Sequence, residues 1–300
     1  MHVVEIKNIH KSFATIKAVD DVSFTVEEGE IFGLLGPNGA GKTTTIRILL
    51  DIFKADQGSV SVLGGPMNDA RKDQIGYMPE ERGLYQDVPL ERCLLYMATL
   101  KGLSTTEAHK RLDGYLEQFD LAEHRQKKIK ELSKGMQQKA QIINTIVHDP
   151  QLIVIDEPFT SLDPVNTQMV KDLMEDLRSR GKTIIMSTHQ MHQVEELCDR
   201  ILIINHGREV LYGELEQIRH RFSGRDVLVK VLGELPELKG VEKVVPHNRE
   251  IKLTLSKQAT PQLILDELVA HKVPLEKFEI AIPELDEIFI RVVTREGENV

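Results

Sequence analysis

Short apolar runs alternate with helix-like segments through the first 220 residues of the chain. Apolar runs of four to five residues indicate buried strands, and strands that alternate with helices are typical of a parallel sheet. We predict such strands at residues 31–35, 152–155, 183–187 and 201–204, and helices at about 164–180 and 190–198. The pattern therefore predicts an α/β fold in which helices flank a parallel sheet.

Two stretches within these 220 residues depart from the alternation. Residues 3–35 predict a small β region, because residues 22–26 alternate strictly between apolar and polar. A further short strand is expected at 59–62. Between about 88 and 148, apolar residues recur instead at three- and four-residue spacing. We therefore expect a β subdomain and a mostly helical insert beside the main sheet.

The order of predicted strands and helices changes again near residue 221. Short strands and two helices follow in an α+β order. We expect strands at 226–232, 241–245, 251–255 and about 277–282, and helices at about 261–271 and after Pro283. The chain is therefore expected to form two domains, a large one at 1–220 and a smaller α+β domain at 221–300.

A glycine-rich stretch follows the first buried strand and opens a helix. It reads Gly36-Pro37-Asn38-Gly39-Ala40-Gly41-Lys42-Thr43-Thr44, which satisfies the pattern G-x-x-x-x-G-K-[ST] in its required strand, turn and helix context. Glycines at this spacing let backbone N–H groups turn inward around phosphate oxygens, because a Cβ would block the approach. Lys42 adds a positive charge for the terminal phosphates, and the Thr43 hydroxyl is left to hold Mg²⁺.

Two carboxylates, Asp156 and Glu157, follow the apolar strand at 152–155. The carboxyl ends of strands are where a parallel α/β sheet binds its ligands. Combined with the phosphate loop, the pair predicts that Asp156 holds Mg²⁺ together with Thr43. Glu157 is then expected to orient or deprotonate the water that attacks the γ-phosphate.

Ser133 and Gly135 lie where a helix should begin. A serine hydroxyl, backbone N–H groups and the positive end of a helix dipole can all face an anion there. The same residues also fit an ordinary cap followed by an amphipathic helix. The residues alone leave both interpretations open.

Composition limits the remaining possibilities. With 41% hydrophobic and 28% charged residues, the chain is typical of a soluble globular protein, and its formal net charge of −9 disfavours nucleic-acid binding. No apolar run approaches the roughly 18 residues of a spanning helix, and no cationic-then-apolar leader is seen, so we expect the chain to stay in the cytosol. Cys93 and Cys198 have no C-x-x-C spacing, which indicates free thiols.

Taken together, these motifs resemble the nucleotide-binding subunit of an ATP-binding cassette (ABC) transporter, over about residues 1–215. The motifs, in family order, are Phe13, the Walker A loop at 36–44, a segment at 76–85, the signature at 132–136, Walker B at 152–157, the D-loop at 161–163 and His189. The resemblance implies an ATPase with the P-loop NTPase core of this family. It also implies that two subunits sandwich two ATP molecules, each held by one subunit's Walker motifs and the other's signature.

The resemblance further implies roles and partners. Phe13 is expected to stack on adenine, Ser133 and Gly135 to contact the γ-phosphate of the partner's ATP, Asp163 to communicate across the dimer, and His189 to steady the γ-phosphate and the attacking water. The expected partners are a second ATPase subunit, in a homodimer or a heterodimer, and a separate membrane permease. No nucleic acid is expected. The chain is then placed at the cytoplasmic face of the membrane.

Two residues depart from the family pattern. Glu80 stands where members usually have Gln, and Met136 replaces the final Gln of the signature. A third carboxylate near Asp156 and Glu157 is expected either to approach Mg²⁺ or to raise the pKa of a neighbour by like-charge repulsion. Our hypothesis is that Glu80 senses the metal and relays to the permease, while Glu157 performs catalysis.

The end of the chain points to export. Residues 283–293 resemble the closing helix of the accessory domain in ABC-2 type ATPases that power drug, antibiotic or sodium export, although they also fit a plain amphipathic helix. Residues 81–85 are similar to the sodium-export members. Residues 85–103 are the candidate to receive the permease's cytoplasmic helix.

Two other functions compete with that of a transporter subunit. They are a soluble ABC-type ATPase that acts on nucleic acid or ribosomes, and a P-loop kinase or GTPase.

Overall fold

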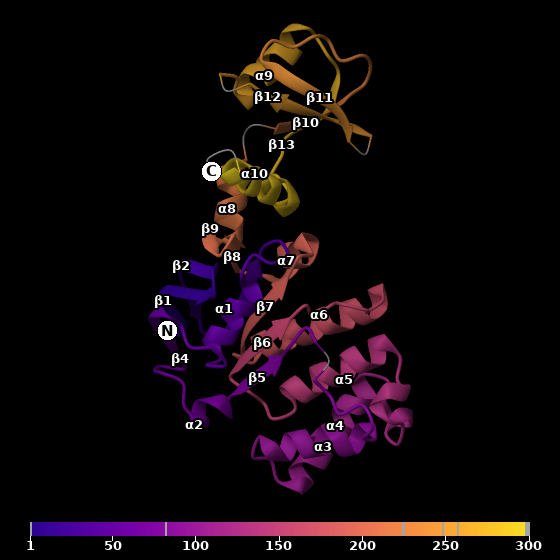
Figure 1. The fold of residues 1–300 in the computed structure, drawn as a ribbon. Coiled ribbons are helices and arrows are strands. Elements are labelled where there is room, and N and C mark those ends of the chain that lie inside the picture. Colours follow the sequence, from indigo (N-terminus) through magenta and orange to yellow (C-terminus); the bar gives the residue numbers. More distant parts are fainter. Residues whose placement is uncertain (1, 82, 224–225, 248, 257, 298–300) are drawn as a thin grey trace. The chain divides into compact units, whose positions relative to one another are not determined.

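The computed structural model describes residues 2–81, 83–223, 226–247, 249–256 and 258–297. The chain forms two compact units, Met1–Tyr212 and Gly213–Val300 (Figure 1). The first unit holds every residue that the sequence associates with ATP. The division falls after Tyr212, whereas the sequence predicted it after residue 220.

A six-stranded sheet lies at the centre of the first unit, in the order β5-β6-β7-β3-β8-β9. These strands are β5 (Ile75–Met78), β6 (Leu152–Asp156), β7 (Thr183–Thr188), β3 (Ile31–Leu35), β8 (Arg200–Asn205) and β9 (Arg208–Glu214). Every residue of β3, β6 and β7 is buried, and the pairings that join β5, β6, β7, β3 and β8 are parallel. The carboxyl ends of these strands therefore meet at one edge, where Leu35, Asp156 and Thr188 lie.

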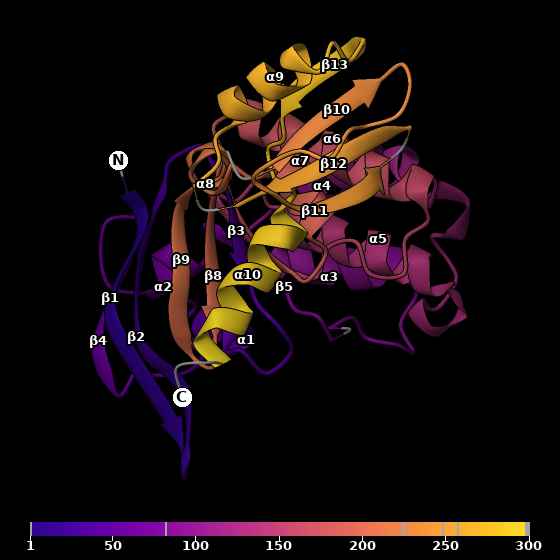
Figure 2. The same cartoon turned by 90° about the horizontal axis from the view of Figure 1, so that it is seen from above.

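A second sheet of the same unit is antiparallel. Strand β1 (His2–Phe13) lies between β2 (Ile16–Glu27) and β4 (Gln57–Val62), an arrangement that can be followed in Figure 2. Its inward-facing residues share one apolar core with β3, and the rings of Phe24 and Phe32 stack with centroids 5.3 Å apart. The alternation of residues 22–26 thus reflects burial of one face of β2.

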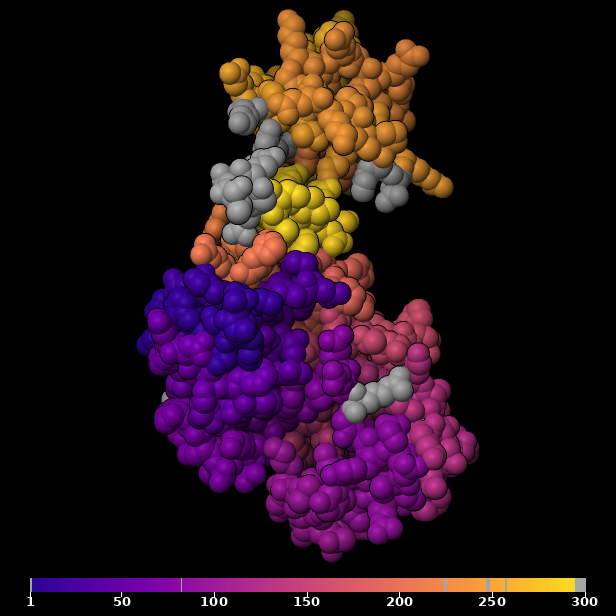
Figure 3. Space-filling model, in the orientation of Figure 1, coloured from indigo at the N-terminus to yellow at the C-terminus, as the bar shows by residue number. Residues whose placement is uncertain are grey.

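Three helices form the insert expected at about 88–148. They are α3 (Leu90–Leu100), α4 (Thr105–Gln118) and α5 (Lys134–Ile146), with short 3-10 turns at Ala122–His124 and Ile129–Glu131. Figure 3 shows this purple-to-magenta part of the chain as a lobe of the first unit. Ser133 caps α5, since its hydroxyl accepts a hydrogen bond from the Met136 N–H at 3.2 Å. The signature residues therefore lie at a helix N-terminus, as expected.

The other helices of the first unit connect its strands. They are α1 (Lys42–Leu49), α2 (Asp69–Lys72), α6 (Pro164–Ser179) and α7 (Met191–Leu197). Asp163 caps α6 by accepting a hydrogen bond from the Asn166 N–H at 2.8 Å. Within the described ranges, no helix combines the length and the apolarity that crossing a membrane requires.

The second unit is an α+β fold with its own core. Its antiparallel sheet has the order β11-β12-β10-β13, from β10 (Asp226–Val231), β11 (Val241–His247), β12 (Glu250–Leu255) and β13 (Leu275–Ile280). Helix α9 (Pro261–Ala270) packs Ile264 and Leu268 against the sheet residues Val227 and Leu253. Helix α8 (Leu215–Phe222) contacts α10 (Leu285–Gly297), which explains why α8 belongs to this unit.

Candidate functional site

The loop between β3 and α1 turns at three glycines. Gly36, Gly39 and Gly41 have φ values of 152°, 78° and 108°, which favour glycine. A Cβ on Gly36 would lie 2.2 Å from the carbonyl oxygen of Ile204, and one on Gly41 would lie 2.4 Å from that of Ala18. Backbone from β8 and β2 thus closes on the loop, and only glycine fits at these two positions.

The loop lines a cavity of about 490 Å³ at the carboxyl edge of the central sheet. Its walls combine the loop, the start of β2, the acidic end of β6 and two histidines. The lining residues are 16–18, 38–44, Glu80, Asp156, Glu157, His189 and His206. The structure therefore brings the predicted phosphate loop, metal ligands and catalytic residues into one site.

Lys42 is the buried cation of this cavity. It is 8% exposed, and its Nζ donates a hydrogen bond to the Gly36 carbonyl oxygen at 2.7 Å. Burial lowers the pKa of Lys42, while the charges of Glu157, Asp156 and Glu80 act in the opposite direction. The acidic neighbours thus help to keep the ammonium charged beside the loop that the sequence predicts to bind phosphates.

Thr43 and Asp156 meet on the floor of the site although they lie 113 residues apart in the chain. Thr43 Oγ1 donates a hydrogen bond to Asp156 Oδ2 at 3.2 Å. Asp156 is 2% exposed, and its Oδ1 accepts a hydrogen bond from the hydroxyl of Ser187. Ser187 lies opposite Asp156 in the β6–β7 pair, so the register of the sheet orients the carboxylate.

These oxygens fit Mg²⁺ in chemical type. Magnesium takes oxygen ligands, and at nucleotide sites one or two protein groups hold it while phosphates and waters complete its shell. Among the residues that the structure describes, no three His, Cys, Asp or Glu side chains form a group that could hold a metal. Thr43 and Asp156 supply oxygen atoms of this kind, and the carboxylate of Glu80 lines the same cavity.

Glu157 has a backbone conformation that is rare for a residue with a side chain, with φ of 55°. Its N–H donates a hydrogen bond to the Ser187 carbonyl oxygen at 2.9 Å. Its carboxylate accepts hydrogen bonds from Thr188 Oγ1 and the His189 N–H, both at 3.2 Å, and lies 2.7 Å from His189 Nδ1. The end of β7 thus fixes this carboxylate at the cavity wall.

Phe13 does not line the cavity. It lies at the end of β1, where its ring packs edge-on against Phe53 with centroids 5.4 Å apart. Ile16, which is 69% exposed, lines the cavity instead. Stacking of Phe13 on adenine stays a prediction, and the sequence did not single out Ile16.

Ser133, Gly135 and Asp163 also lie outside the cavity lining. Ser133 and Asp163 are exposed caps of α5 and α6. Hydrogen bonds from Asn166 lower the pKa of the Asp163 carboxyl group. A residue that contacts a second subunit has to be exposed and to lie away from its own subunit's cavity, and Ser133 and Asp163 meet both conditions.

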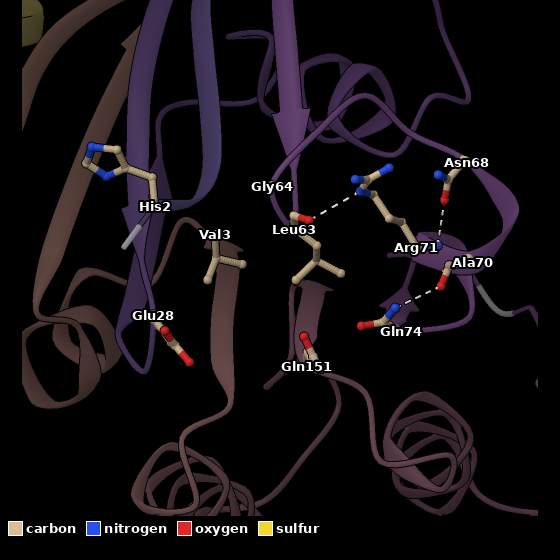
Figure 4. A pocket seen from close by; sticks show the side chains of 10 residues that line it. All are labelled: His2, Val3, Glu28, Leu63, Gly64, Asn68, Ala70, Arg71, Gln74 and Gln151. Carbon is tan, nitrogen blue, oxygen red and sulfur yellow. Dashed lines mark hydrogen bonds between the residues drawn. The ribbon is translucent and has the colours of Figure 1, made fainter.

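A second cavity, of about 380 Å³, has a different character (Figure 4). Arg71 Nε donates a hydrogen bond to the Leu63 carbonyl oxygen at 3.2 Å, and Gln74 Nε2 donates one to that of Ala70 at 3.0 Å. Asn68 Oδ1 accepts a hydrogen bond from the Arg71 N–H. These polar groups bond to one another, and no residue with a predicted role lines this cavity.

Three supporting residues escaped the sequence analysis. Ser187 and Thr188 hold Asp156 and Glu157 by their hydroxyls, and their place at the end of a buried strand was a usable signal. Gln138 donates hydrogen bonds to the carbonyl oxygens of Glu157 and Pro158. No local pattern marks Gln138, because its partners lie 19 and 20 residues further along the chain.

The phosphate loop and the acidic strand end, joined in a parallel sheet, define a P-loop nucleoside triphosphatase. The ABC transporter family model matches residues 19–160, and the model of the C-terminal domain of DrrA1-3-like ATP-binding proteins matches residues 213–293. The chain belongs to the ATP-binding subunits of ABC transporters, a family that binds and hydrolyses ATP. The second match begins where the second compact unit begins.

Similarity to individual proteins extends over nearly the whole chain. The uncharacterized ABC transporter ATP-binding protein YhaQ of Bacillus subtilis (strain 168) is 38% identical over 97% of this chain and 98% of its own. Nod factor export ATP-binding protein I of Rhizobium sp. (strain N33) is 34% identical over 99% and 98%. A solved ATP-binding subunit of an ABC transporter is 34% identical with a TM-score of 0.69, over 73% of this chain and 93% of that one.

Proposed function

We propose that this subunit binds MgATP, closes on a second ATPase subunit around the nucleotide, hydrolyses it and thereby drives a separate membrane permease. The observation that carries the proposal is the hydrogen bond of 3.2 Å between Thr43 and Asp156, in one cavity with Lys42. It joins the phosphate loop to the acidic strand, which is the arrangement that phosphoryl transfer from MgATP needs.

In this proposal the loop at 36–44 surrounds the phosphates with backbone N–H groups, and Lys42 contacts the terminal phosphates. Thr43 and Asp156 hold Mg²⁺, which when bound neutralises charge on the phosphate oxygens. Ile16 and Phe13 are the apolar candidates for contact with adenine. Ile16 has the stronger support, because it lines the cavity.

Hydrolysis is assigned to Glu157. Its carboxylate takes a proton from the attacking water as the water oxygen bonds to the γ-phosphorus, and the bond from that phosphorus to the bridging oxygen of ADP breaks. His189 Nδ1 lies 2.7 Å from the Glu157 carboxylate, which leaves Nε2 of the ring to contact the attacking water and the γ-phosphate.

The second ATPase subunit is proposed to supply Ser133 and Gly135 to this nucleotide, with Asp163 beside the contact. Ser133 and Asp163 are exposed at the starts of α5 and α6, which supports the assignment because the N-terminal end of a helix favours an anion. A homodimer and a heterodimer both satisfy it. Binding energy shared between two subunits is lost on hydrolysis, so closure and reopening can do work on the permease.

The permease is proposed to dock by a cytoplasmic helix on the insert near α3. Tyr85, Tyr96 and Leu100 are 52%, 49% and 60% exposed there, and the two tyrosine rings lie 6.1 Å apart. Exposed aromatic and aliphatic residues of this kind suit the apolar face of a helix. Glu80 precedes this segment and lines the cavity, which suits a relay from nucleotide to permease.

Docking on a permease places the subunit at the cytoplasmic face of the membrane. Export is the proposed direction, supported by the similarity to an export ATP-binding protein. A sodium ion and a drug-like solute both remain candidates for the cargo. The alternative of action on nucleic acid or ribosomes is disfavoured by the formal net charge of −9. Stimulation of ATP turnover by nucleic acid would favour that alternative.

Turnover of two variants tests the assignment of catalysis. Glu157→Gln removes the proposed base, so we expect it to lower kcat by about a hundredfold or more. Glu80→Gln restores the residue usual in the family, so we expect it to keep measurable turnover. ATP hydrolysis by the purified full chain decides between them. Normal turnover of Glu157→Gln with loss of activity in Glu80→Gln would mean that the roles are reversed.

Crosslinking tests the shared site. Ser133→Cys and Gly39→Cys, introduced together into the Glu157→Gln chain, are expected to form an intersubunit crosslink only when MgATP is present. Cys93 and Cys198 are both buried, so background reaction should be low. A crosslink that never forms with ATP contradicts the shared site.

A further inference from the structure

The segment between β6 and α6 follows a backbone path that its residues rarely adopt. Glu157 at its start and Ser161 near its end have φ values of 55° and 65°, in the region that favours glycine. Residues persist in such conformations when their surroundings over-determine them. The contacts around this segment therefore decide where the Glu157 carboxylate lies.

Helix α5 provides one of these contacts through Gln138. This half-buried side chain donates from Nε2 to the carbonyl oxygens of two consecutive residues, Glu157 at 3.2 Å and Pro158 at 3.1 Å. A glutamine amide has two N–H donors, so it can satisfy both carbonyls. Because the Glu157 N–H is bonded to Ser187 on the other side, the peptide groups before and after its Cα are both anchored.

Neighbouring residues of α5 reach the far end of the same segment. Lys139 Nζ donates a hydrogen bond to Asn166 Oδ1 at 3.1 Å, and Asn166 donates in turn to both carboxylate oxygens of Asp163, at 2.8 and 2.7 Å. The first turn of α5 approaches so closely that a Cβ on Gly135 would lie 3.1 Å from the Ser161 carbonyl oxygen. Helix α5 thus contacts the segment near both of its ends.

We propose that Gln138 is a positioning residue for ATP hydrolysis. It holds the Glu157 peptide so that the carboxylate stays at the cavity wall, and it does not itself line the cavity. The inference rests on the proposed function, because it takes Glu157 as the base. Gln138 belongs to the helix that Ser133 caps, so the helix whose start faces the second subunit also supports the catalytic carboxylate of its own subunit.

Two substitutions of Gln138 separate positioning from mere structural support. Gln138→Met keeps the length of the side chain and removes both donors, whereas Gln138→Lys keeps a donor at the end of a flexible chain. We expect Gln138→Met to lower kcat of the full chain roughly ten- to a hundredfold, because small displacements of a catalytic group are costly. KM and ATP affinity should stay within about twofold, since the cavity lining is unchanged. Gln138→Lys should recover most of kcat.

Gln168→Met is the matched control. Gln168 lies on α6 of the same unit, and its amide donates to the side chain of Asp172 at 2.8 Å and not to the catalytic segment. We expect normal kcat for this variant, and a melting curve for each variant confirms that it is folded.

Glu157→Gln, measured in parallel, separates this inference from the proposed function. An inactive Glu157→Gln beside a normally active Gln138→Met overturns the positioning role and leaves the proposed function standing. A loss in Gln138→Met that Gln138→Lys does not recover also overturns it. Normal turnover of Glu157→Gln removes the proposed function and the inference together.

Discussion

Lys42 is a buried lysine, and burial disfavours the charged form of its ammonium group. Burial lowers the pKa of Lys42, whereas the charges of three nearby carboxylates raise it. The Nζ atom lies 2.7 Å from a carbonyl oxygen of the phosphate loop. The charge is therefore held beside the loop before phosphate arrives. Charge-assisted hydrogen bonds are about twice as strong as neutral ones, so this ammonium should contribute strongly to nucleotide affinity.

Lys42→Ala is accordingly expected to weaken ATP binding by about ten- to a hundredfold, which corresponds to roughly 1.4–2.8 kcal/mol. Isothermal titration of the folded variant with MgATP measures this change. Unchanged affinity would mean that backbone N–H groups alone hold the phosphates.

His148 is a half-buried histidine outside the cavity lining. Its Nε2 lies 3.2 Å from the Ile75 carbonyl oxygen, which also accepts a hydrogen bond from Lys101 Nζ at 3.1 Å. Burial first and the charge of Lys101 second lower the pKa of His148 to about 4, although Asp149 and Asp73 act in the opposite direction. The folded chain therefore favours the neutral ring.

This lowered pKa predicts a loss of stability in mild acid. The unfolded chain binds a proton at this ring near pH 6.5 and the folded chain only near pH 4, so the free energy of unfolding falls as the pH drops through that window. Between pH 7 and pH 5 the ring should account for about 2 kcal/mol. His148→Gln cannot titrate, and urea unfolding at both pH values should show a smaller fall by that amount. An identical fall in both chains contradicts the lowered pKa.

At the scale of elements, the phosphate loop is shaped by backbone from strands on either side. Ala40 accepts a hydrogen bond from the Gly207 N–H at 2.8 Å, and the Gly207 carbonyl accepts one from the Asp20 N–H at 2.8 Å. Gly41 lies where a Cβ would meet Ala18 of β2, whereas a Cβ on Gly39 would have no atom within 4 Å. Two glycines of one loop are therefore required for different reasons.

The pair Gly39→Ala and Gly41→Ala separates backbone strain from steric overlap. Gly39→Ala should lower the free energy of unfolding by about 1–2 kcal/mol, because only its positive φ opposes a side chain. Gly41→Ala should cost about 3 kcal/mol or more, because its Cβ also overlaps the Ala18 carbonyl. Urea unfolding measures both values. Equal losses would show that β2 yields to the added methyl group.

Strand β9 and helix α8 were not predicted from the sequence, and the same physical reason applies to both. Strand β9 buries only Leu211, and helix α8 buries only Leu215 and Ile218, so neither carries a strong apolar pattern. For this reason no sequence pattern marked a boundary earlier than residue 220, whereas the compact units divide after Tyr212. Strands buried on both faces, such as β3 and β6, were recognisable because nearly all of their residues are apolar.

At the scale of the whole molecule, each of the two compact units has an apolar core among the residues that the structure describes. One joins the two sheets of the first unit, and the other lies between α9 and the sheet of the second. Tyr212 anchors the end of the first unit, since its hydroxyl donates to the Thr25 carbonyl at 3.2 Å and its ring lies 5.0 Å from the Arg200 guanidinium. Units with separate cores can in principle fold alone.

A chain that ends at residue 214, after β9, is therefore expected to fold and to bind ATP within about threefold of the full chain. Circular dichroism and titration with MgATP measure both properties. An unfolded product would show that the second unit is needed for the stability of the first.

The sequence by itself determined the phosphate loop, the acidic strand end and the order of family motifs, because these depend on residue type and local spacing. Only the tertiary structure decided that Thr43 meets Asp156, that Ile16 lines the cavity, and that Gln138 bonds to the Glu157 peptide. Contacts of this kind join residues far apart in the chain. They follow from strand register and helix packing, which no local pattern encodes.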